Sequence, residues 1–134
     1  MSLENNNPGN LEVGGPRFEG QIDPPDGIFL RFIDPPHGLR AIIERMKAYQ
    51  DNDGCKTLHD IIYRWAPPAD NNPTERYLTN VSTWTGIDED SVPDFTQAAT
   101  CDAMMKAITR QENGSQPFSQ FTIDRAVAMV LGTA

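Results

Sequence analysis

The fold class is decided by the stretch DPPHGLRAIIERMKAY, residues 34–49. Asp34 can cap a helix and Pro35 suits its first turn, and the apolar residues that follow recur at the spacing of one helical face. We therefore predict a helix that begins at Asp34 and stops at residues 51–54. Its buried face is predicted to comprise Leu39, Ile42, Ile43, Met46 and Tyr49.

The helical period continues through the rest of the chain. Four more helices are predicted. The first is capped by Thr57 and the second by Asn72, the third runs from about Asp94 to Glu112, and the fourth begins at Thr122. Gly86 and the pair Asn113-Gly114 have the residue types that end helices in a left-handed conformation. The predicted buried faces contain Leu58, Ile61, Ile62, Trp65, Tyr77, Leu78, Val81, Trp84, Phe95, Ala98, Cys101, Met105, Ile108, Ile123, Ala126, Val127, Val130 and Leu131.

The segment before the first helix has a different composition. Residues 8–33 are rich in proline and glycine, which excludes a helix and favours turns between short extended pieces. The run GIFLRFI, residues 27–33, is predicted to form one strand of a small hairpin. The fold class is thus mostly α (α+β), with about five helices and a β-hairpin and loop region near the N-terminus. The 134 residues are predicted to form a single domain.

Charge and hydropathy disfavour several classes of protein. The net charge is −8, and no basic cluster is present, so nucleic-acid binding is not expected. No apolar run reaches the ~20 residues of a membrane span, and no signal peptide is recognised, so membrane insertion is not expected either.

Cysteine and histidine give no sign of a metal or cofactor. Cys55 and Cys101 lack the spacing of metal ligands, and a disulfide between them is left open, with two reduced thiols the favoured interpretation. His37 and His59 are interpreted as surface or packing residues. The two tryptophans fall on apolar helical faces, which favours core packing over sugar stacking.

Glu112 is the main candidate for chemistry. It lies in the last turn of a predicted helix, where the negative end of the helix dipole favours the protonated carboxyl that a general acid needs. A solvated carboxylate at a helix end is the more common arrangement, and this position alone favours that interpretation.

Two further groups of polar residues are candidates for a binding site. The run Asn5-Asn6-Asn7-Pro8-Gly9-Asn10 is dense in amide side chains that can bind a polyhydroxylated ligand, although asparagine and glycine are also ordinary turn residues. The carboxylates that flank the predicted hairpin are candidates for a second catalytic acid, and they are Glu19, Asp23 and Asp26.

Two fragments resemble enzymes that cleave peptidoglycan. The stretch RQENG, residues 110–114, is similar to the end of the catalytic helix in soluble lytic transglycosylases, with Glu112 at the catalytic position and Asn113 in place of the usual serine. Residues 5–11, with Phe18-Glu19-Gly20 and Phe29–Phe32, are similar to the paired-asparagine motif and β-element of bacterial glucosaminidases.

Nearly all of residues 5–131 resembles a group of small phage and prophage proteins. These are described as structural proteins or virion-associated muralytic enzymes, and the lysin of the enveloped double-stranded RNA phages is a relative. In lysozyme-like enzymes the catalytic helix precedes the paired-asparagine motif, whereas here it follows by about 100 residues. The resemblance therefore implies a lysozyme-like fold that is circularly permuted, with residues 1–4 interpreted as a leader or cloning remnant.

The resemblance implies cleavage of the β-1,4 bond between N-acetylmuramic acid and N-acetylglucosamine. Glu112 is then the acid and base of a lytic transglycosylase, and Asn6, Asn7 and Asn10 bind the substrate. The implied partners are peptidoglycan and other virion proteins, and the implied location is a phage virion or the bacterial cytoplasm. The alternatives are a phage structural protein without activity and a carbohydrate-binding module. The net charge of −8 slightly favours both alternatives, because an acidic surface is not attracted to an anionic cell envelope.

Overall fold

The computed structural model describes residues 3–133, so the first two residues of the expected leader lie outside the described part. Within that part, the chain forms five α-helices and one two-stranded antiparallel hairpin near the N-terminus, which confirms the predicted fold class. The elements are β1 (Gln21–Asp26), β2 (Phe29–Phe32), α1 (Pro35–Asn52), α2 (Leu58–Trp65), a short 3-10 helix (Pro68–Asp70), α3 (Thr74–Thr85), α4 (Ala98–Asn113) and α5 (Gln120–Leu131).

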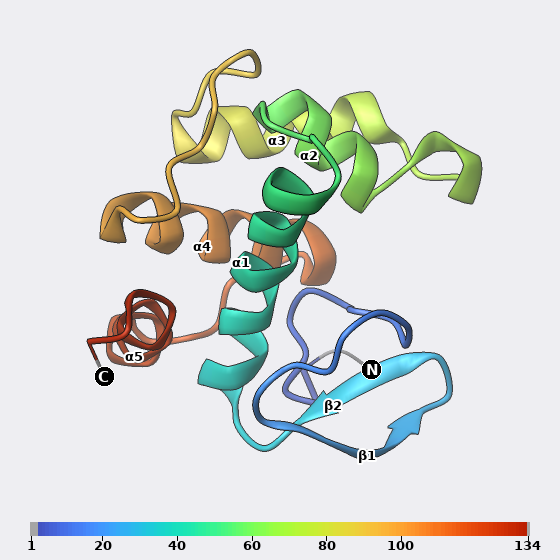
Figure 1. The fold of residues 1–134 in the computed structure, drawn as a ribbon, viewed down its shortest axis with the longest axis vertical. Helices are drawn as coiled ribbons and strands as arrows, with labels where there is room; N and C mark the ends of the chain where they lie inside the picture. Colours follow the sequence, from blue (N-terminus) through green and yellow to red (C-terminus); the bar gives the residue numbers. More distant parts are fainter. Residues whose placement is uncertain (1–2, 134) are drawn as a thin grey trace.

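Helix α1 is the centre of the molecule. Figure 1 shows it between the hairpin on one side and α5 on the other, while α2 and α3 lie at its far end. The helix starts as predicted, because the side chain of Asp34 accepts a hydrogen bond from the backbone N–H of His37 and Pro35 occupies the first turn. Its buried residues form one core with α2, α3, α4 and α5, as the helical period indicates.

Two helices begin later than predicted. Helix α4 begins at Ala98, because the Asp94 carboxylate instead accepts hydrogen bonds from the backbone N–H (3.0 Å) and hydroxyl (2.6 Å) of Thr96 and so forms a turn. Ala98 is therefore exposed at the helix start, and its predicted burial is wrong. Helix α3 begins at Thr74 without the predicted Asn72 cap, since the Asn72 amide donates to the carbonyl of Pro67 (3.1 Å).

The last helix begins slightly earlier than predicted. The side chain of Ser119 caps α5 by accepting from the N–H of Thr122, so Thr122 lies inside the first turn. The predicted glycine stops are confirmed, because Gly86 (φ 75°) and Gly114 (φ 78°) end α3 and α4 in the left-handed conformation.

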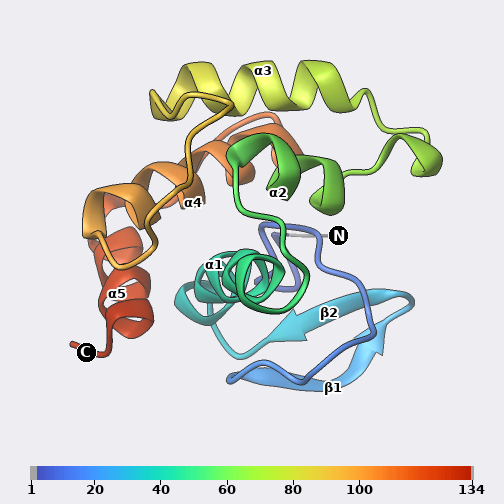
Figure 2. The ribbon, with the colours of Figure 1, turned by 45° about the horizontal axis from the view of Figure 1, so that its top comes forward.

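The hairpin carries a third extended segment along its edge. Leu11 and Val13 continue the pairing of β2, through hydrogen bonds from Leu30 N–H to Leu11 oxygen (2.9 Å) and from Val13 N–H to Ile28 oxygen (2.7 Å). Leu11, Leu30 and Phe32 are buried against Ala41 of α1 in a small second core. Figure 2 shows the hairpin beside α1, on the side away from α5. The N-terminal segment is therefore fixed between the hairpin and the helices.

Asn7 joins this segment to β2. Its side chain is fully buried, donates to the carbonyls of Leu11 (2.9 Å) and Leu30 (3.0 Å), and accepts from the N–H of Leu11 (2.9 Å). The expected substrate-binding role of Asn7 is therefore wrong, because the side chain has no exposed surface and its amide is used within the protein.

We expect Asn7→Ala to lower the free energy of unfolding by about 3 kcal/mol, because it leaves buried backbone groups without partners. Urea unfolding followed by circular dichroism measures this change. Asn80→Ala is the matched control, since the Asn80 amide makes one part-buried hydrogen bond to Gln111 (3.0 Å), and it should lose less than about 1 kcal/mol. Equal losses in the two variants would contradict this role of Asn7.

The cysteines and histidines of the described residues lie in separate parts of the fold. Cys55 and Cys101 are free thiols, and burial raises the pKa of the Cys101 thiol to about 11. His37 contacts Asp34 (2.6 Å), and His59 stacks on Tyr63. Within residues 3–133, no group of three potential metal ligands is found, and no helix has the length and apolar character needed to cross a membrane.

Candidate active site at the end of helix α4

The Glu112 carboxyl group is held by two hydrogen-bond donors from distant parts of the chain. One oxygen accepts from the side-chain amide of Asn10 (2.9 Å), and the other accepts from the hydroxyl of Tyr77 (2.7 Å). Glu112 is partly buried, one residue before the last residue of α4. The carboxyl group is therefore oriented by protein contacts rather than extended into solvent, as a solvated helix end would be.

Tyr77 links Glu112 to Trp65. The Tyr77 hydroxyl accepts from the indole N–H of Trp65 (2.9 Å) while it donates to Glu112. Burial, followed by the charge of Glu112 and its hydrogen bond, raises the pKa of Tyr77 well above its usual value of about 10. The hydroxyl therefore stays protonated at neutral pH, and it remains a hydrogen-bond donor to Glu112.

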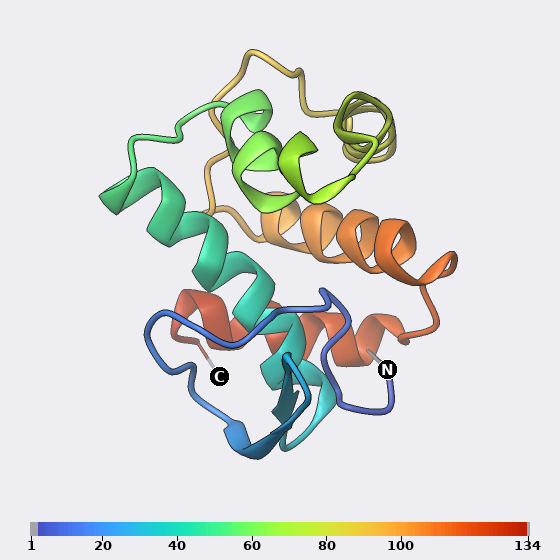
Figure 3. The ribbon, with the colours of Figure 1, turned by 90° about the vertical axis from the view of Figure 1, so that its right-hand side faces the viewer.

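The asparagine turn, residues 5–10, lies against the end of α4. Besides the Asn10 contact, the side-chain amide of Asn113 donates to the carbonyl of Pro8 (2.9 Å) and to that of Thr109 (3.0 Å). Figure 3 shows the N-terminal segment passing beside α4. Two motifs separated by about 100 residues thus lie together, as a permuted order of one site requires.

An open groove of about 1030 Å³ includes Glu112 in its wall. Its lining includes residues 9–16, the end of α1 and Arg64–Pro67, together with Asp70 and Asn72. Trp65 is half-buried, packs against both hydrophobic clusters and also lines the groove. It therefore contributes to core packing and can also contact a ligand in the groove. Trp84 instead packs against the main core, with the Arg110 guanidinium 4.0 Å from its ring centre.

One similar protein places the chain among phage proteins. The chain is 36% identical over 125 residues to Protein P5 of Pseudoalteromonas phage PM2, and the match covers 87% of this chain and 73% of that protein. The chain belongs to the Protein P5 family. No protein-family model matches the chain. Membership in the Protein P5 family confirms the expected relation to phage proteins, while the muralytic activity implied by the resemblance stays a hypothesis.

The other two asparagines of the predicted binding site have different positions in this member of the Protein P5 family. Asn6 and Asn10 adopt left-handed backbone conformations (φ 54° and 51°), which asparagine tolerates better than most residues. The Asn6 amide donates to the carbonyl of Phe32 (3.0 Å), so it holds the hairpin. Asn10 alone of the three predicted residues contacts Glu112 and lines the groove.

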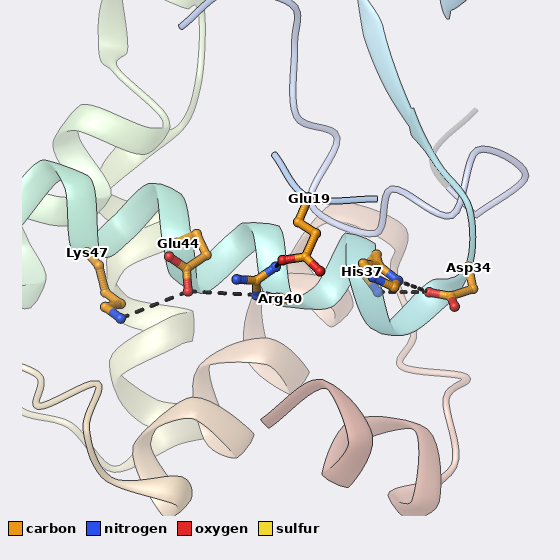
Figure 4. A network of polar contacts seen from close by, with 6 residues as sticks. All are labelled: Glu19, Asp34, His37, Arg40, Glu44 and Lys47. Atoms are coloured by element: carbon orange, nitrogen blue, oxygen red, sulfur yellow. Dashed lines mark hydrogen bonds and ion pairs between the residues drawn. The ribbon is translucent and has the colours of Figure 1, made fainter. Parts of the chain in front are cut away.

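The three proposed second carboxylates lie outside the groove wall. Glu19 forms an ion pair with Arg40 (2.8 Å), as Figure 4 shows. Asp23 forms an ion pair with Arg17 (3.1 Å), and Asp26 accepts from the Asn5 amide (2.9 Å).

Three other carboxylates line the groove together with Glu112, namely Glu12, Asp53 and Asp70. Glu12 was not predicted as a site residue, although its position two residues after Asn10 was a usable signal. Tyr77 was not predicted as a site residue either, because a buried tyrosine on an apolar helical face is typical of core packing.

Under the muralytic hypothesis that the resemblance implies, we expect Tyr77→Phe to lower kcat about tenfold with little change in KM, because Glu112 loses one of the two contacts that orient it. The variant should also lose about 1–3 kcal/mol of stability, since the Trp65 N–H loses its acceptor. Steady-state kinetics on soluble peptidoglycan fragments measure the first effect. Tyr63→Phe is the matched control, because the Tyr63 hydroxyl bonds to Glu75 away from the groove, and its kcat should be unchanged. A rise in KM alone for Tyr77→Phe would contradict a role in orienting Glu112.

Proposed function

We propose that this chain is a muralytic enzyme, and that it acts as a lytic transglycosylase on the bond between N-acetylmuramic acid and N-acetylglucosamine. The observation that carries the proposal is the placement of Glu112. Its carboxyl group lies at a helix end, in the wall of an open groove, and contacts both Asn10 and Tyr77. A carboxyl group held in one orientation beside a groove is suited to transfer a proton to a bound ligand.

Glu112 serves twice in the proposed reaction. It first donates its proton to the glycosidic oxygen, so that the bond to C1 of the muramic acid breaks and the N-acetylglucosamine leaves with a new hydroxyl group. The carboxylate then takes the proton of the muramic acid 6-hydroxyl, whose oxygen bonds to C1 and closes an anhydro ring. The proton acquired in the second step restores the starting state of Glu112, so no water is consumed.

A transglycosylase accounts for the groove better than a two-carboxylate hydrolase does. A hydrolase needs a second carboxylate placed opposite the acid to act as base or nucleophile. Asp53 is already paired with Arg64 (3.6 Å), and the three carboxylates that flank the hairpin do not line the groove. Glu12 and Asp70 line the groove, but among the described residues neither carboxylate has a hydrogen bond or ion pair that would orient it as Glu112 is oriented. Glu112 is the carboxylate that both matches a catalytic motif and is oriented by neighbouring side chains.

The size of the groove suits a polymer. Its volume of about 1030 Å³ is at the upper limit of pockets for small ligands, and it is open rather than enclosed. Together with membership in a phage protein family, this supports a protein that acts on the periplasmic peptidoglycan as part of a virion. Other virion proteins would then be its partners.

A second candidate function is a phage structural protein or carbohydrate-binding module that does not cleave. Both oxygens of Glu112 already accept hydrogen bonds from the protein, which is also what a purely structural carboxylate would do. In that case the groove binds a glycan, or nothing, without turnover.

Purified sacculi labelled with a dye distinguish these candidates. We expect the wild-type protein both to sediment with the sacculi and to release soluble dye over time. Sedimentation without release would favour the binding module, and the absence of both would favour the structural protein. Tyr63→Phe serves as a variant that should behave as the wild type does.

A further inference from the structure

We propose that Arg45 binds a carboxylate carried by the glycan strand, and so selects peptidoglycan over neutral glycans such as chitin. This inference rests on the proposed function, because it assigns the substrate class of the same groove. Arg45 lies on α1 and lines the groove that contains Glu112.

The guanidinium of Arg45 has no polar partner among residues 3–133. No carboxylate lies within ion-pair distance of it, and its Nη2 atom is buried without an acceptor. A buried donor without a partner is costly and rare in folded proteins. Because arginine stays charged, a site that leaves its donors unused within the protein is suited to an external acceptor.

Neighbouring cations on α1 differ from Arg45. Figure 4 shows that Arg40 pairs with Glu19 (2.8 Å) and that Lys47 lies near Glu44 (3.9 Å). Arg64, the other cation in the groove wall, lies near Asp53 (3.6 Å). Of the two, Arg45 is therefore the one whose charge is not matched by a carboxylate in the described part of the chain.

The position of Arg45 is fixed by a ring rather than by an anion. Its guanidinium carbon lies 5.1 Å from the ring centre of Phe18, at a distance typical of cation–π contact. Arg45 also borders a smaller pocket of about 270 Å³ on the Phe18 side, so it forms part of the wall between two hollows. The cation is thus held in place before a ligand arrives, which lowers the entropic cost of binding.

The charges of the groove indicate a carboxylate as the ligand. Glu12, Asp70 and Glu112 make the wall acidic, so a strand that carries negative groups needs a local cation to approach it. A hydrogen bond from a guanidinium to a carboxylate is stronger than one to a neutral acceptor, and the nitrogens of Arg45 other than the buried Nη2 are accessible to donate it. In peptidoglycan such a carboxylate comes either from the lactyl group of a muramic acid without peptide or from the stem peptide.

Binding to three tetrasaccharides tests the proposal. The ligands are a muramic acid glycan with free lactyl groups, the same glycan with stem peptides, and neutral chitotetraose. Calorimetry is done in the Glu112→Gln background, so that no ligand is consumed. We expect Arg45→Gln to weaken binding of at least one carboxylate ligand by roughly tenfold to a hundredfold, the effect of one charged hydrogen bond, and to leave chitotetraose unchanged.

Matched variants show whether the effect belongs to this position. Arg40→Gln removes the same charge from α1 at a residue outside the groove, and it should bind all three ligands as the background does. Arg45→Lys should recover part of the lost affinity. The glycan that loses affinity in Arg45→Gln identifies the source of the carboxylate as sugar or peptide.

Two results would overturn the inference. If Arg45→Gln weakens all three ligands equally, or none of them, while the wild-type protein cleaves sacculi, the inference is wrong and the proposed function stands. If none of the three ligands binds and the wild-type protein leaves sacculi intact, both are wrong.

Discussion

Glu112→Gln is expected to abolish cleavage of peptidoglycan. Glutamine keeps the volume of the side chain and one acceptor for Asn10, but it has no proton of suitable acidity for the glycosidic oxygen. Proton transfer by a positioned acid contributes roughly 10²–10⁴-fold to a rate, so the rate of dye release from sacculi should fall by that factor. Binding to sacculi, measured by sedimentation, should persist.

The stability of Glu112→Gln should stay within about 1 kcal/mol of the wild-type value. Removal of a negative charge from the end of α4 is favourable by about 0.3–1 kcal/mol, and the weakening of the Tyr77 contact offsets it. Glu75→Gln is the control, because it removes an equal charge from an exposed side chain that bonds to Tyr63, and its activity should be unchanged. Full activity of Glu112→Gln would move the chemistry elsewhere, with Glu12 the first carboxylate of the groove to test.

Gly38→Ala is expected to disrupt both the fold near the hairpin and the site. A Cβ atom at Gly38 would lie 1.8 Å from the carbonyl oxygen of Asn6, a backbone atom that can move only if the whole asparagine turn moves. Overpacking of this kind typically costs 1–3 kcal/mol, and the gain in helix propensity from alanine, about 1 kcal/mol, does not compensate for a displaced turn. Because Asn10 belongs to that turn, we also expect activity to fall at least tenfold.

Thermal unfolding and dye release are the two measurements for Gly38→Ala. Lys47→Gly provides the control, because it weakens the same helix by about 1 kcal/mol without contact to the turn. It should lose stability but retain its activity. If Gly38→Ala is as stable and as active as the wild-type protein, the asparagine turn does not depend on the close approach to α1.

The helices were predictable because their signals are local. The apolar period and Asp34-Pro35 fix α1, and the glycine stops fix the ends of α3 and α4, as the structure confirms. The errors fall at helix starts. At Asp94 and Asn72 a side chain that could cap a helix bonds instead to a nearby turn, and the sequence does not indicate which of the two contacts is formed.

The site was only partly predictable, because it depends on contacts across about 100 residues. Glu112 was selected by its place at a helix end and Asn10 by the amide-rich run, and the resemblance then implied their roles, whereas their contact is a property of the tertiary structure. Asn7 is an asparagine of the same motif as Asn10, yet its side chain is buried by its neighbours. Tyr77 looked like core, and it is core, but its hydroxyl also reaches Glu112.

Mass spectrometry of the fragments released from peptidoglycan tests the central claim most directly. Sacculi are incubated with the wild-type protein and, separately, with Glu112→Gln, and the ends of the soluble glycans are identified. The proposed mechanism predicts 1,6-anhydro muramic acid ends from the wild-type protein and none from the variant. Reducing ends in place of anhydro ends, or no fragments from the wild-type protein, would contradict it.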